Sequence, residues 1–548
     1  MKAKPDMSFW KLWDLSFGFF GVQIAYALQS ANVSRIFTTI GADPHDLSFF
    51  WVLPPLMGLI VQPIVGSASD KTWNRFGRRL PYLIFGALVA IIVMCLLPNA
   101  GSLGLGVSSA ILVGLIALML LDTSINMAMQ PFKMLVGDMV NEKQKGLAYS
   151  IQSFLCNAGS IVGYIFPFLF TWIGLKNIAD PGVVPPTVVW SFYIGAAILL
   201  LCVIYSLVKI KEWPPHVYNE YNGIEETPKG KAPKQNLFKL LVHAPSTFWT
   251  VGIVQFFCWF AFLFMWTYTP GTIAHNAFHA PEVEAVKGIE FTDNAGQKVH
   301  LTGKYFLTAD NQVIIDNGVE KMPLSSLKPG SEIKMAGIMS TVPATGELFL
   351  DEVETFTIAD PANAQPIKQV ELDASSKEYN DAGNWVGILF AVQAIGSVLW
   401  AVLLPRFKSR KFSYSLSLIL GAIGFISSAF ITNQYLLFVS FVLIGCAWAA
   451  MLAWPFTILT NSLKGGNIGA YLGLFNCTIC IPQIVAALAG RGILGALSTP
   501  TAAAPQYWMM FIAGISIAIG AICVVFIREG KASDSDMPVE ETPEVSEI

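Results

Sequence analysis

The chain has 548 residues, of which 54% are hydrophobic, 12% aromatic and only 13% charged, and its mean hydropathy is +0.56. Since about a quarter of the residues of a soluble domain are charged, much of this chain must avoid water. The composition excludes a soluble multidomain enzyme and a disordered scaffold, and the net charge of −3 excludes the basic excess of a nucleic-acid binder. It predicts a polytopic membrane protein, with no enzyme activity and no cofactor expected.

About twelve apolar runs are long enough to cross a hydrocarbon core of ~30 Å, which takes about 20 residues each. They lie near 12–36, 47–66, 80–98, 107–132, 147–173, 188–208, 247–272, 385–404, 413–432, 436–460, 468–494 and 507–527. An even number of spans places both termini on one side of the membrane. The predicted fold is an all-α polytopic membrane protein, with about twelve transmembrane helices in two six-helix halves.

Two long polar segments interrupt the apolar runs. The second of them, 281–384, has 17 acidic and 8 basic residues, and its alternating apolar residues between turn signals predict short strands. The predicted parts of the chain are an N-terminal six-helix half (1–208), a cytoplasmic linker (209–246), helix 7 (247–280), an extracytoplasmic β-rich insert (281–384), helices 8–12 of the C-terminal half (385–528) and a disordered acidic tail (529–548).

The orientation follows from the basic residues of the short loops. They gather on the side of the N-terminus, in stretches such as 71–79 and 406–411, and the positive-inside rule therefore places both termini in the cytoplasm. The 281–384 insert has no N-x-S/T glycosylation sequon. We therefore predict a multi-pass protein of the cell inner membrane, with the insert in the periplasm.

Four ionisable residues stand out within the apolar runs: Asp14, Arg35, Asp122 and Lys133. Asp14 and Arg35 lie near the ends of the first run and are equally consistent with interfacial anchors and with functional groups. Asp122 lies about 15 residues into the fourth run, where burial away from water favours the neutral carboxyl, as a reversible proton carrier requires. The alternative is a structural, hydrogen-bonded aspartate.

Polar side chains continue from Asp122 along one face of its helix, through Asn126 and Gln130 to Lys133. A polar face at membrane depth must look onto protein or water. Amides and aromatic rings on other runs suit a sugar, whose hydroxyls need donors and acceptors and whose C–H faces stack on rings; the alternative is contact between helices. The predicted substrate-binding residues are Gln23, Tyr26, Gln29, Asn126, Gln130, Trp259, Trp266, Asn476 and Gln483. No disulfide framework and no metal site are predicted, because all eight cysteines lie in apolar stretches.

The loop between the second and third runs carries the charges of a predicted gating latch: Asp70, Arg75, Arg78 and Arg79. These residues lie where helix ends meet the cytoplasm, and they can pair with one another and with helix C-termini. Such pairs would hold the inner side shut and break in each cycle. The alternative is that they are topological charges alone.

Several motifs resemble the major facilitator superfamily. The loop Gly66-Ser67-Ala68-Ser69-Asp70, followed by Arg75-Phe76-Gly77-Arg78-Arg79, resembles its G-x-x-x-D…R-x-G-R-R loop. Three further stretches resemble the sucrose/maltose–proton symporter branch, within the glycoside–pentoside–hexuronide:cation symporters: Gly21-Val22-Gln23…Gln29, Leu121-Asp122…Asn126…Pro131…Asp138 and Gly473…Asn476…Pro482-Gln483. The 281–384 insert has no counterpart in the usual members of that family.

The resemblance implies a twelve-helix fold with alternating access, in which Asp122 takes the coupling proton. The basic partner that the family carries on the same helix falls at Lys133, where the usual residue is arginine, and the two are not equivalent for bidentate bonding. The partners implied are a small neutral sugar, a proton and the lipid bilayer, and a monomer is expected.

The sequence therefore predicts a secondary active transporter that imports a neutral sugar, such as the di-glucosides maltose or sucrose, by proton symport. A sugar facilitator, or a monosaccharide or sodium symporter on the same fold, remains an alternative. So does a membrane-anchored receptor that acts through the 281–384 insert, which could dock an extracytoplasmic partner. A drug exporter is disfavoured by the amide-rich polar faces.

Overall fold

The computed structural model describes most of the chain. The described residues are 4–42, 46–180, 182–222, 244–292, 298–305, 314–316, 321–323, 332–336, 339–341, 348–350, 353–357, 365–462, 474–499 and 502–527. The tail predicted at 529–548, and much of the linker predicted at 209–246, lie outside them.

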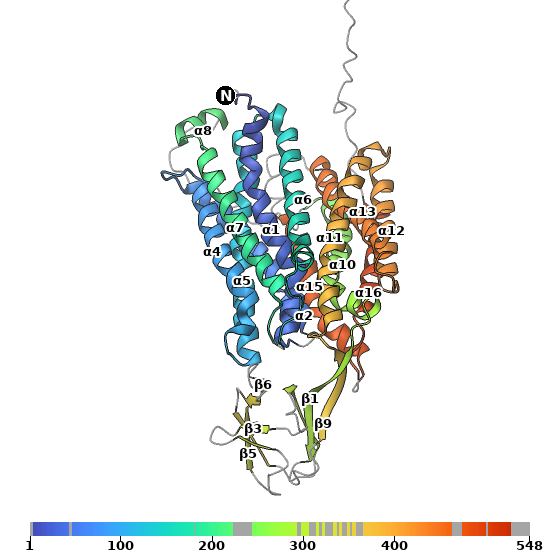
Figure 1. The fold of residues 1–548 in the computed structure, drawn as a ribbon. Coiled ribbons are helices and arrows are strands. Elements are labelled where there is room, and N and C mark those ends of the chain that lie inside the picture. The colour runs from blue at the N-terminus through green and yellow to red at the C-terminus, as the bar shows by residue number, and fades with distance from the viewer. Residues whose placement is uncertain are drawn as a thin grey trace, which may run out of the picture.

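Long helices stand side by side in two groups, one from each half of the chain (Figure 1). The N-terminal half consists of α1 (Phe9–Ile40), α2 (Leu47–Phe50), α3 (Leu53–Lys71), α4 (Leu80–Leu96), η1 (Leu97–Ser102), α5 (Val107–Met139), α6 (Glu142–Trp172) and α7 (Pro186–Lys209), followed by the short α8 (Pro215–Asn222). The C-terminal half consists of α10 (Ser246–Asn276), α11 (Lys377–Leu403), η4 (Leu404–Arg406), α12 (Arg410–Ser428), α13 (Leu437–Ser462), α15 (Cys477–Leu497), α16 (Tyr507–Cys523) and η5 (Val524–Phe526). The two-half all-helical fold is thus confirmed.

Eleven helices of the described residues are long and apolar enough to cross a membrane. They coincide with all the predicted runs except the first. That run forms α1, which packs within the bundle (Figure 1). The glutamines and the asparagine of α1 lower its mean hydropathy. Its interior polar groups are therefore buried among other helices rather than exposed to lipid.

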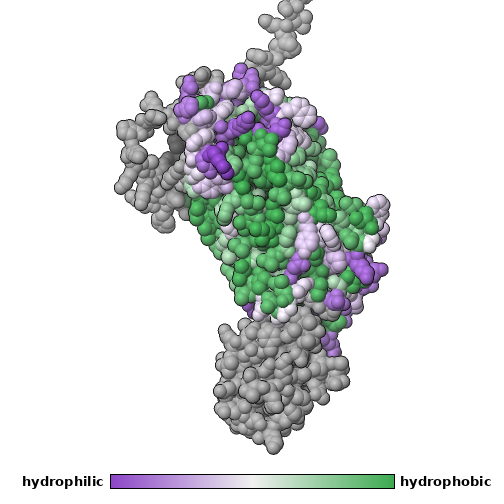
Figure 2. All heavy atoms as spheres, turned by 60° about the vertical axis from the view of Figure 1, so that its left-hand side comes forward, coloured by the Kyte–Doolittle hydropathy of each residue, from purple (hydrophilic) through white to green (hydrophobic). Residues whose placement is uncertain are grey.

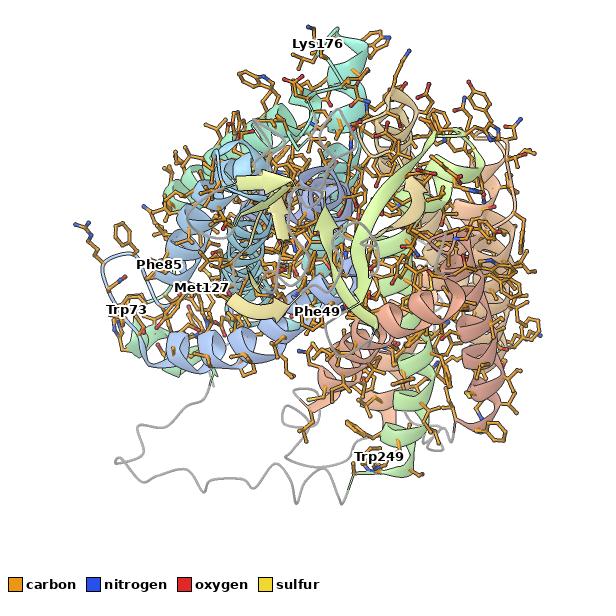
Figure 3. All side chains as sticks on the ribbon, turned by 90° about the horizontal axis from the view of Figure 1, so that it is seen from below. Phe49, Trp73, Phe85, Met127, Lys176 and Trp249 are labelled. Atoms are coloured by element: carbon orange, nitrogen blue, oxygen red, sulfur yellow. The ribbon has the colours of Figure 1, made fainter. Side chains whose placement is uncertain are left out.

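The outer surface of the bundle is an apolar belt with polar residues at its two ends (Figure 2). Leu201, Ile92 and Val525 are 65%, 67% and 69% exposed, which in water would be unfavourable. Seen from below, Phe85 lies at the outer rim of the N-terminal half, whereas Phe49 lies where the two halves meet (Figure 3). The belt is the surface that a bilayer would cover.

The insert follows α10 and consists of short strands. They are β1 (Glu282–Thr292), β2 (Lys298–Tyr305), β3 (Ile314–Asp316), β4 (Lys321–Pro323), β5 (Glu332–Ala336), β6 (Met339–Thr341), β7 (Leu348–Leu350), β8 (Val353–Thr357) and β9 (Gln365–Leu372). The strand order β2-β1-β9 forms one antiparallel sheet, and β3-β4, β5-β8 and β6-β7 form antiparallel pairs. The β-rich character of the insert is confirmed.

The insert ends earlier than the sequence predicts. The Ser376 hydroxyl accepts from the Tyr379 backbone N–H and caps α11, which begins at Lys377 rather than near residue 385. Lysine, glutamate and asparagine in the first turns of α11 hide this start from a search for apolar residues. We call the end of the bundle that carries β1 and β9 the insert end.

The root of the insert is fixed to the C-terminal half. The two ends of the insert, where the chain leaves α10 and where it enters α11, are joined by a hydrogen bond from the Asp373 N–H to the Pro281 carbonyl over 2.8 Å. Strand β9 also contacts the segment between α15 and α16, where the Ala503 N–H donates to the Val370 carbonyl over 3.0 Å. The root is therefore held at three places in one half of the bundle: α10, α11 and the α15–α16 segment.

The two halves meet at the insert end. Arg491 of α15 forms an ion pair with Asp46, which precedes α2, at 3.1 Å. A Cβ at Gly490 would lie 2.7 Å from Ser48 of α2, so these helices are in close contact there. Further in, a Cβ at Gly387 of α11 would lie 2.1 Å from the Tyr164 carbonyl oxygen of α6. These contacts close the bundle from the insert end toward its middle.

Candidate functional site

Asp122 lies in the middle of α5 and is almost completely buried, with 1% of its surface exposed. Its Oδ1 accepts a hydrogen bond from Nε2 of Gln29 in α1 over 2.9 Å. Gln29 is also 1% exposed, and among the described residues neither Asp122 Oδ2 nor Gln29 Oε1 has a hydrogen-bond partner. Two residues predicted separately, one for a proton and one for substrate, thus form a single buried pair.

Other predicted polar residues surround this pair. The Asn126 amide donates to the Asp122 carbonyl and accepts from Gln62 of α3 over 2.7 Å. Tyr26, one turn before Gln29 on α1, interacts electrostatically with Asp122 and with Tyr164 of α6. Helices α1, α3 and α5 therefore contribute polar side chains around Asp122, and Tyr164 of α6 lies next to Tyr26. Gln62 and Tyr164 were not predicted as site residues.

Gln23 extends the polar face of α1 away from the insert end. Its Oε1 accepts from the Ser160 hydroxyl of α6 over 3.4 Å. Ser30, seven residues further along α1, donates to the Tyr164 hydroxyl over 3.4 Å, and the Tyr164 ring meets Phe390 of α11 edge-on at 5.6 Å. The α1–α6 face thus reaches the other half of the bundle at Phe390.

The C-terminal half contributes a cluster of tryptophans. Trp259 and Trp266 of α10, both predicted, contact Trp448 of α13 edge-on, with ring centroids 5.7 and 5.9 Å apart. Trp266 also stacks on Trp51, between α2 and α3, at 6.4 Å. Within the described part of the chain, the buried Trp259 indole N–H has no hydrogen-bond acceptor. The cluster therefore combines aromatic ring faces with the Trp259 N–H as a hydrogen-bond donor. Trp448 was not predicted as a site residue, because the sequence of α13 is typical of an apolar core helix.

Asn476 and Gln483 make contacts within their own helix. Asn476 precedes α15, and its amide donates to the Cys480 sulfur at 3.8 Å. The Gln483 amide donates to the Ile479 carbonyl over 3.0 Å. The side-chain oxygens of these two amides are not held by those bonds.

The loop between α3 and α4 meets the end of α5 opposite the insert. Arg78 Nη2 and Arg79 Nε lie 2.7 and 3.0 Å from Oδ2 of Asp138, and Oδ1 of Asp138 accepts from Tyr218 of α8. Glu212 accepts from the backbone N–H groups of three loop residues, 78–80. These contacts lie within the N-terminal half.

The remaining predicted loop and helix residues fall into two groups. Arg75 is exposed and its guanidinium lies over the Phe76 ring at 4.6 Å. The side chains of Asp70, Gln130 and Lys133 lie outside the described part of the structure, although their backbones belong to α3 and α5. In the described part of the chain, no three His, Cys, Asp or Glu side chains gather as metal ligands would.

Arg35 forms a second polar cluster, at the insert end. It is fully buried, and its guanidinium donates to asparagine oxygens of both halves: Asn177 at 2.9 Å, Asn380 at 2.9 Å and Asn384 at 2.8 Å. Asn177 links in turn to Asp381 over 3.0 Å. Sequence reasoning left the role of Arg35 open, because its partners lie more than 140 residues away.

Comparison with known proteins shows the family to which the chain belongs. A family model described as Major Facilitator Superfamily matches residues 15–286 and 355–546. The chain belongs to the major facilitator superfamily. The unmatched stretch between the two segments covers most of the insert, so this superfamily chain carries an insertion between two helices of its C-terminal half. Membership indicates a transporter rather than an enzyme.

Curated relatives match only in part. A membrane-associated transporter protein of Mus musculus is 25% identical over 341 residues, which cover 53% of this chain and 63% of the relative. The sucrose transport protein SUT1 of Oryza sativa subsp. japonica is 26% identical over 302 residues, covering 48% and 54%. The proton-associated sugar transporter A of Mus musculus is 27% identical over 168 residues, covering 29% and 22%. The chain thus spans between 22% and 63% of the length of these relatives.

Solved structures share the fold. A mutant of the nucleoside transporter NupG superposes with a TM-score of 0.57 at 10% identity, covering 94% of this chain and 99% of that one. A D-xylose-proton symporter superposes with a TM-score of 0.55 at 14% identity, covering 96% and 100%. Identities this low support the fold alone.

Proposed function

We propose that the chain is a secondary active transporter that imports a neutral sugar together with a proton. The observation that carries the proposal is the buried Asp122–Gln29 pair, because an ionisable group at membrane depth is costly and marks a transport path. A carboxyl group at this depth that can bind and release a proton can be ionised in one step of the transport cycle and neutral in another. The names of the rice sucrose transport protein and the mouse proton-associated sugar transporter support the same substrate and coupling ion.

The sugar would lie between the polar face of α1 and the tryptophans of the other half. Gln23, Tyr26 and Asn126 supply donors and acceptors for hydroxyl groups, and Trp259 and Trp266 supply rings for the C–H faces of the sugar. A di-glucoside such as maltose or sucrose has enough hydroxyls to engage both halves. The further amides proposed as contacts are Gln29, Gln130, Asn476 and Gln483.

The described contacts fit an inward-open conformation. If the basic loops face the cytoplasm, the insert lies in the periplasm, and the contacts at the insert end close the periplasmic side. Opening that side would separate Arg491 from Asp46. On the cytoplasmic side, Arg75, Arg78, Arg79 and Asp70 would act as the latch, with Asp138 and Glu212 as partners that hold the loop in place.

Uptake by proteoliposomes tests the proposal. An imposed inward proton gradient should drive accumulation of labelled maltose or sucrose, and Asp122→Asn should abolish accumulation while leaving exchange of sugar across the membrane. Asp6→Asn is the matched control, because Asp6 is an exposed carboxylate that bonds Asn141 outside the membrane-spanning helices.

Other outcomes would select the alternatives. Uptake that does not depend on the proton gradient and is unchanged in Asp122→Asn would indicate a facilitator. Accumulation driven by a sodium gradient would indicate a sodium symporter. Uptake of xylose or glucose but neither disaccharide would make it a monosaccharide carrier. Binding of sugar by the insert without any uptake would favour a receptor.

A further inference from the structure

The Asp122–Gln29 pair has one hydrogen bond and two unused acceptors. Gln29 Nε2 donates to Asp122 Oδ1, whereas Gln29 Oε1 and Asp122 Oδ2 are buried and have no hydrogen-bond partner in the described part of the chain. An ionised carboxylate can only accept hydrogen bonds, and an amide oxygen can only accept them as well. The pair as it stands therefore leaves two buried lone-pair groups without a donor, which is unfavourable.

A single proton would satisfy both groups. When a proton from the aqueous side binds Asp122 Oδ2, the carboxylate becomes a carboxylic acid and this oxygen becomes a donor. Gln29 can then accept from Oδ2 while it continues to donate to Oδ1. An amide and a carboxylic acid are complementary in this way, with one donor and one acceptor on each. No other bond forms or breaks, and the same proton leaves when the acid ionises.

Among the described residues, no charge near the pair would replace this proton. Tyr26, one turn from Gln29 on α1, has Tyr164 and Cys156 of α6 and Cys480 of α15 around it, and none of these side chains can carry a positive charge. The adjacent α3 contributes the uncharged Gln62, and the titratable residues of α4, Tyr82 and Cys95, lie near the two ends of that helix. Among the described residues, no cation contacts the Asp122 carboxyl group.

We propose that Gln29 is the positioning residue of the proton site. Its side chain donates one hydrogen bond to the ionised form of Asp122, and it both donates to and accepts from the protonated form. This inference rests on the proposed function for its role in transport. Protonation raises the number of hydrogen bonds between α1 and α5 from one to two. Because Gln23, Tyr26 and Ser30 lie on the same helix as Gln29, a change in the α1–α5 contact reaches the proposed sugar-binding face directly.

Infrared spectroscopy of the purified full chain in lipid tests the pair without sugar or a gradient. The carbonyl band of a protonated carboxylic acid should appear as the pH falls, and its loss in Asp122→Asn assigns it to Asp122. Gln29→Leu should shift this band to the position of an acid without a hydrogen-bond partner. Gln152→Leu should leave it unchanged, because Gln152 is a buried glutamine of α6 whose amide donates to the Phe132 carbonyl and not to Asp122. An unchanged band in Gln29→Leu would overturn the proposal.

A swap of the two groups gives a second measurement. In the double variant Gln29→Glu/Asp122→Asn, the acid lies on α1 and the amide on α5, so the complementary pair is restored in mirrored form. We expect about tenfold or greater loss of proton-driven uptake in Gln29→Leu, and a return of pH-dependent uptake in the swap. A swap variant that shows no pH-dependent carbonyl band would contradict the proposal. A band that behaves as expected in a protein that transports no tested sugar would overturn the proposed function and leave the proton site standing.

Discussion

The Arg35 guanidinium donates from Nη1 to Oδ1 of Asn384 over 2.8 Å, which joins α1 of one half to α11 of the other. The guanidinium also donates to the oxygens of Asn177 and Asn380, so a fully buried cation is held by neutral amides. Hydrogen bonds from a charged donor to a neutral acceptor are weaker than those of an ion pair. If the halves separate at this end in the proposed transport cycle, hydrogen bonds of this intermediate strength would be easier to break than an ion pair.

Removing this cation should destabilise the protein. Arg35→Ala leaves the buried oxygens of Asn380 and Asn384 without the arginine donor, whereas the Asn177 oxygen still accepts from Thr187. We expect this change to cost about 2 kcal/mol and to lower the melting temperature of the protein in detergent. Arg406→Ala, at an exposed position between α11 and α12, is the matched control and should melt with the wild type. A melting temperature unchanged in Arg35→Ala would show that the cluster contributes little to stability.

Strengthening the contact should slow transport. Asn384→Asp places a carboxylate against Arg35. The Thr171 hydroxyl, which accepts from Asn384 and donates to the Pro167 carbonyl, can turn away from that carbonyl to donate to the new carboxylate. The added charge is worth about 1 kcal/mol or more in the closed state, so we expect uptake to fall several-fold while sugar binding is retained. Asn99→Asp is the control, because Asn99 bonds Tyr193 within the N-terminal half alone. Uptake at the wild-type rate in Asn384→Asp would argue that this contact does not limit opening.

Asp138 should be essential for the order of the loop between α3 and α4. Asp138→Ala removes the carboxylate that pairs with Arg78 and with the 2%-exposed Arg79. Losing a charge-assisted hydrogen-bond partner of this kind costs about 1.5–3 kcal/mol, which should appear as a lower melting temperature and faster proteolysis in the loop. Asp180→Ala, at a carboxylate between α6 and α7, supplies the comparison.

Trp448 should contribute to sugar affinity although it was not predicted. Its ring contacts both Trp259 and Trp266, so Trp448→Ala should remove stacking surface and allow the other two rings to move. We expect the KM for sugar to rise about tenfold, with a smaller change in Trp448→Phe. Trp190→Ala, on the outer face of α7 at 48% exposure, should leave the KM unchanged. A rise in KM of equal size in both alanine variants would point to a general loss of folded protein.

Labelling of intact cells should establish the orientation. A membrane-impermeant maleimide should react with Glu282→Cys at the start of β1, because that position is exposed at the insert end. The same reagent should reach His216→Cys, in α8 at the opposite end, only after the membrane is permeabilised. The reversed pattern would place the insert in the cytoplasm.

The sequence was sufficient for the fold because apolar runs of membrane length are local signals. It misplaced the start of α11, since Lys377, Glu378 and Asn380 are polar although they are helical. The same limit applies to the site. Asp122 and Gln29 could each be singled out as polar groups in apolar runs, but their pairing spans 93 residues and is visible only in space. Arg35 and Trp448 show the same difficulty, because their partners come from other helices.

The attachment of β9 to the α15–α16 segment, together with its passage into α11, has a mechanical consequence. Both ends of the insert, and the contact of β9 with the α15–α16 segment, belong to the C-terminal half, so the β2-β1-β9 sheet is fixed to that half. Strand β6 of the same insert contacts α5 of the N-terminal half. If the halves tilt against each other in the proposed transport cycle, the contact between β6 and α5 must therefore shift or break, and a pair of fluorophores on β6 and α5 would report that movement.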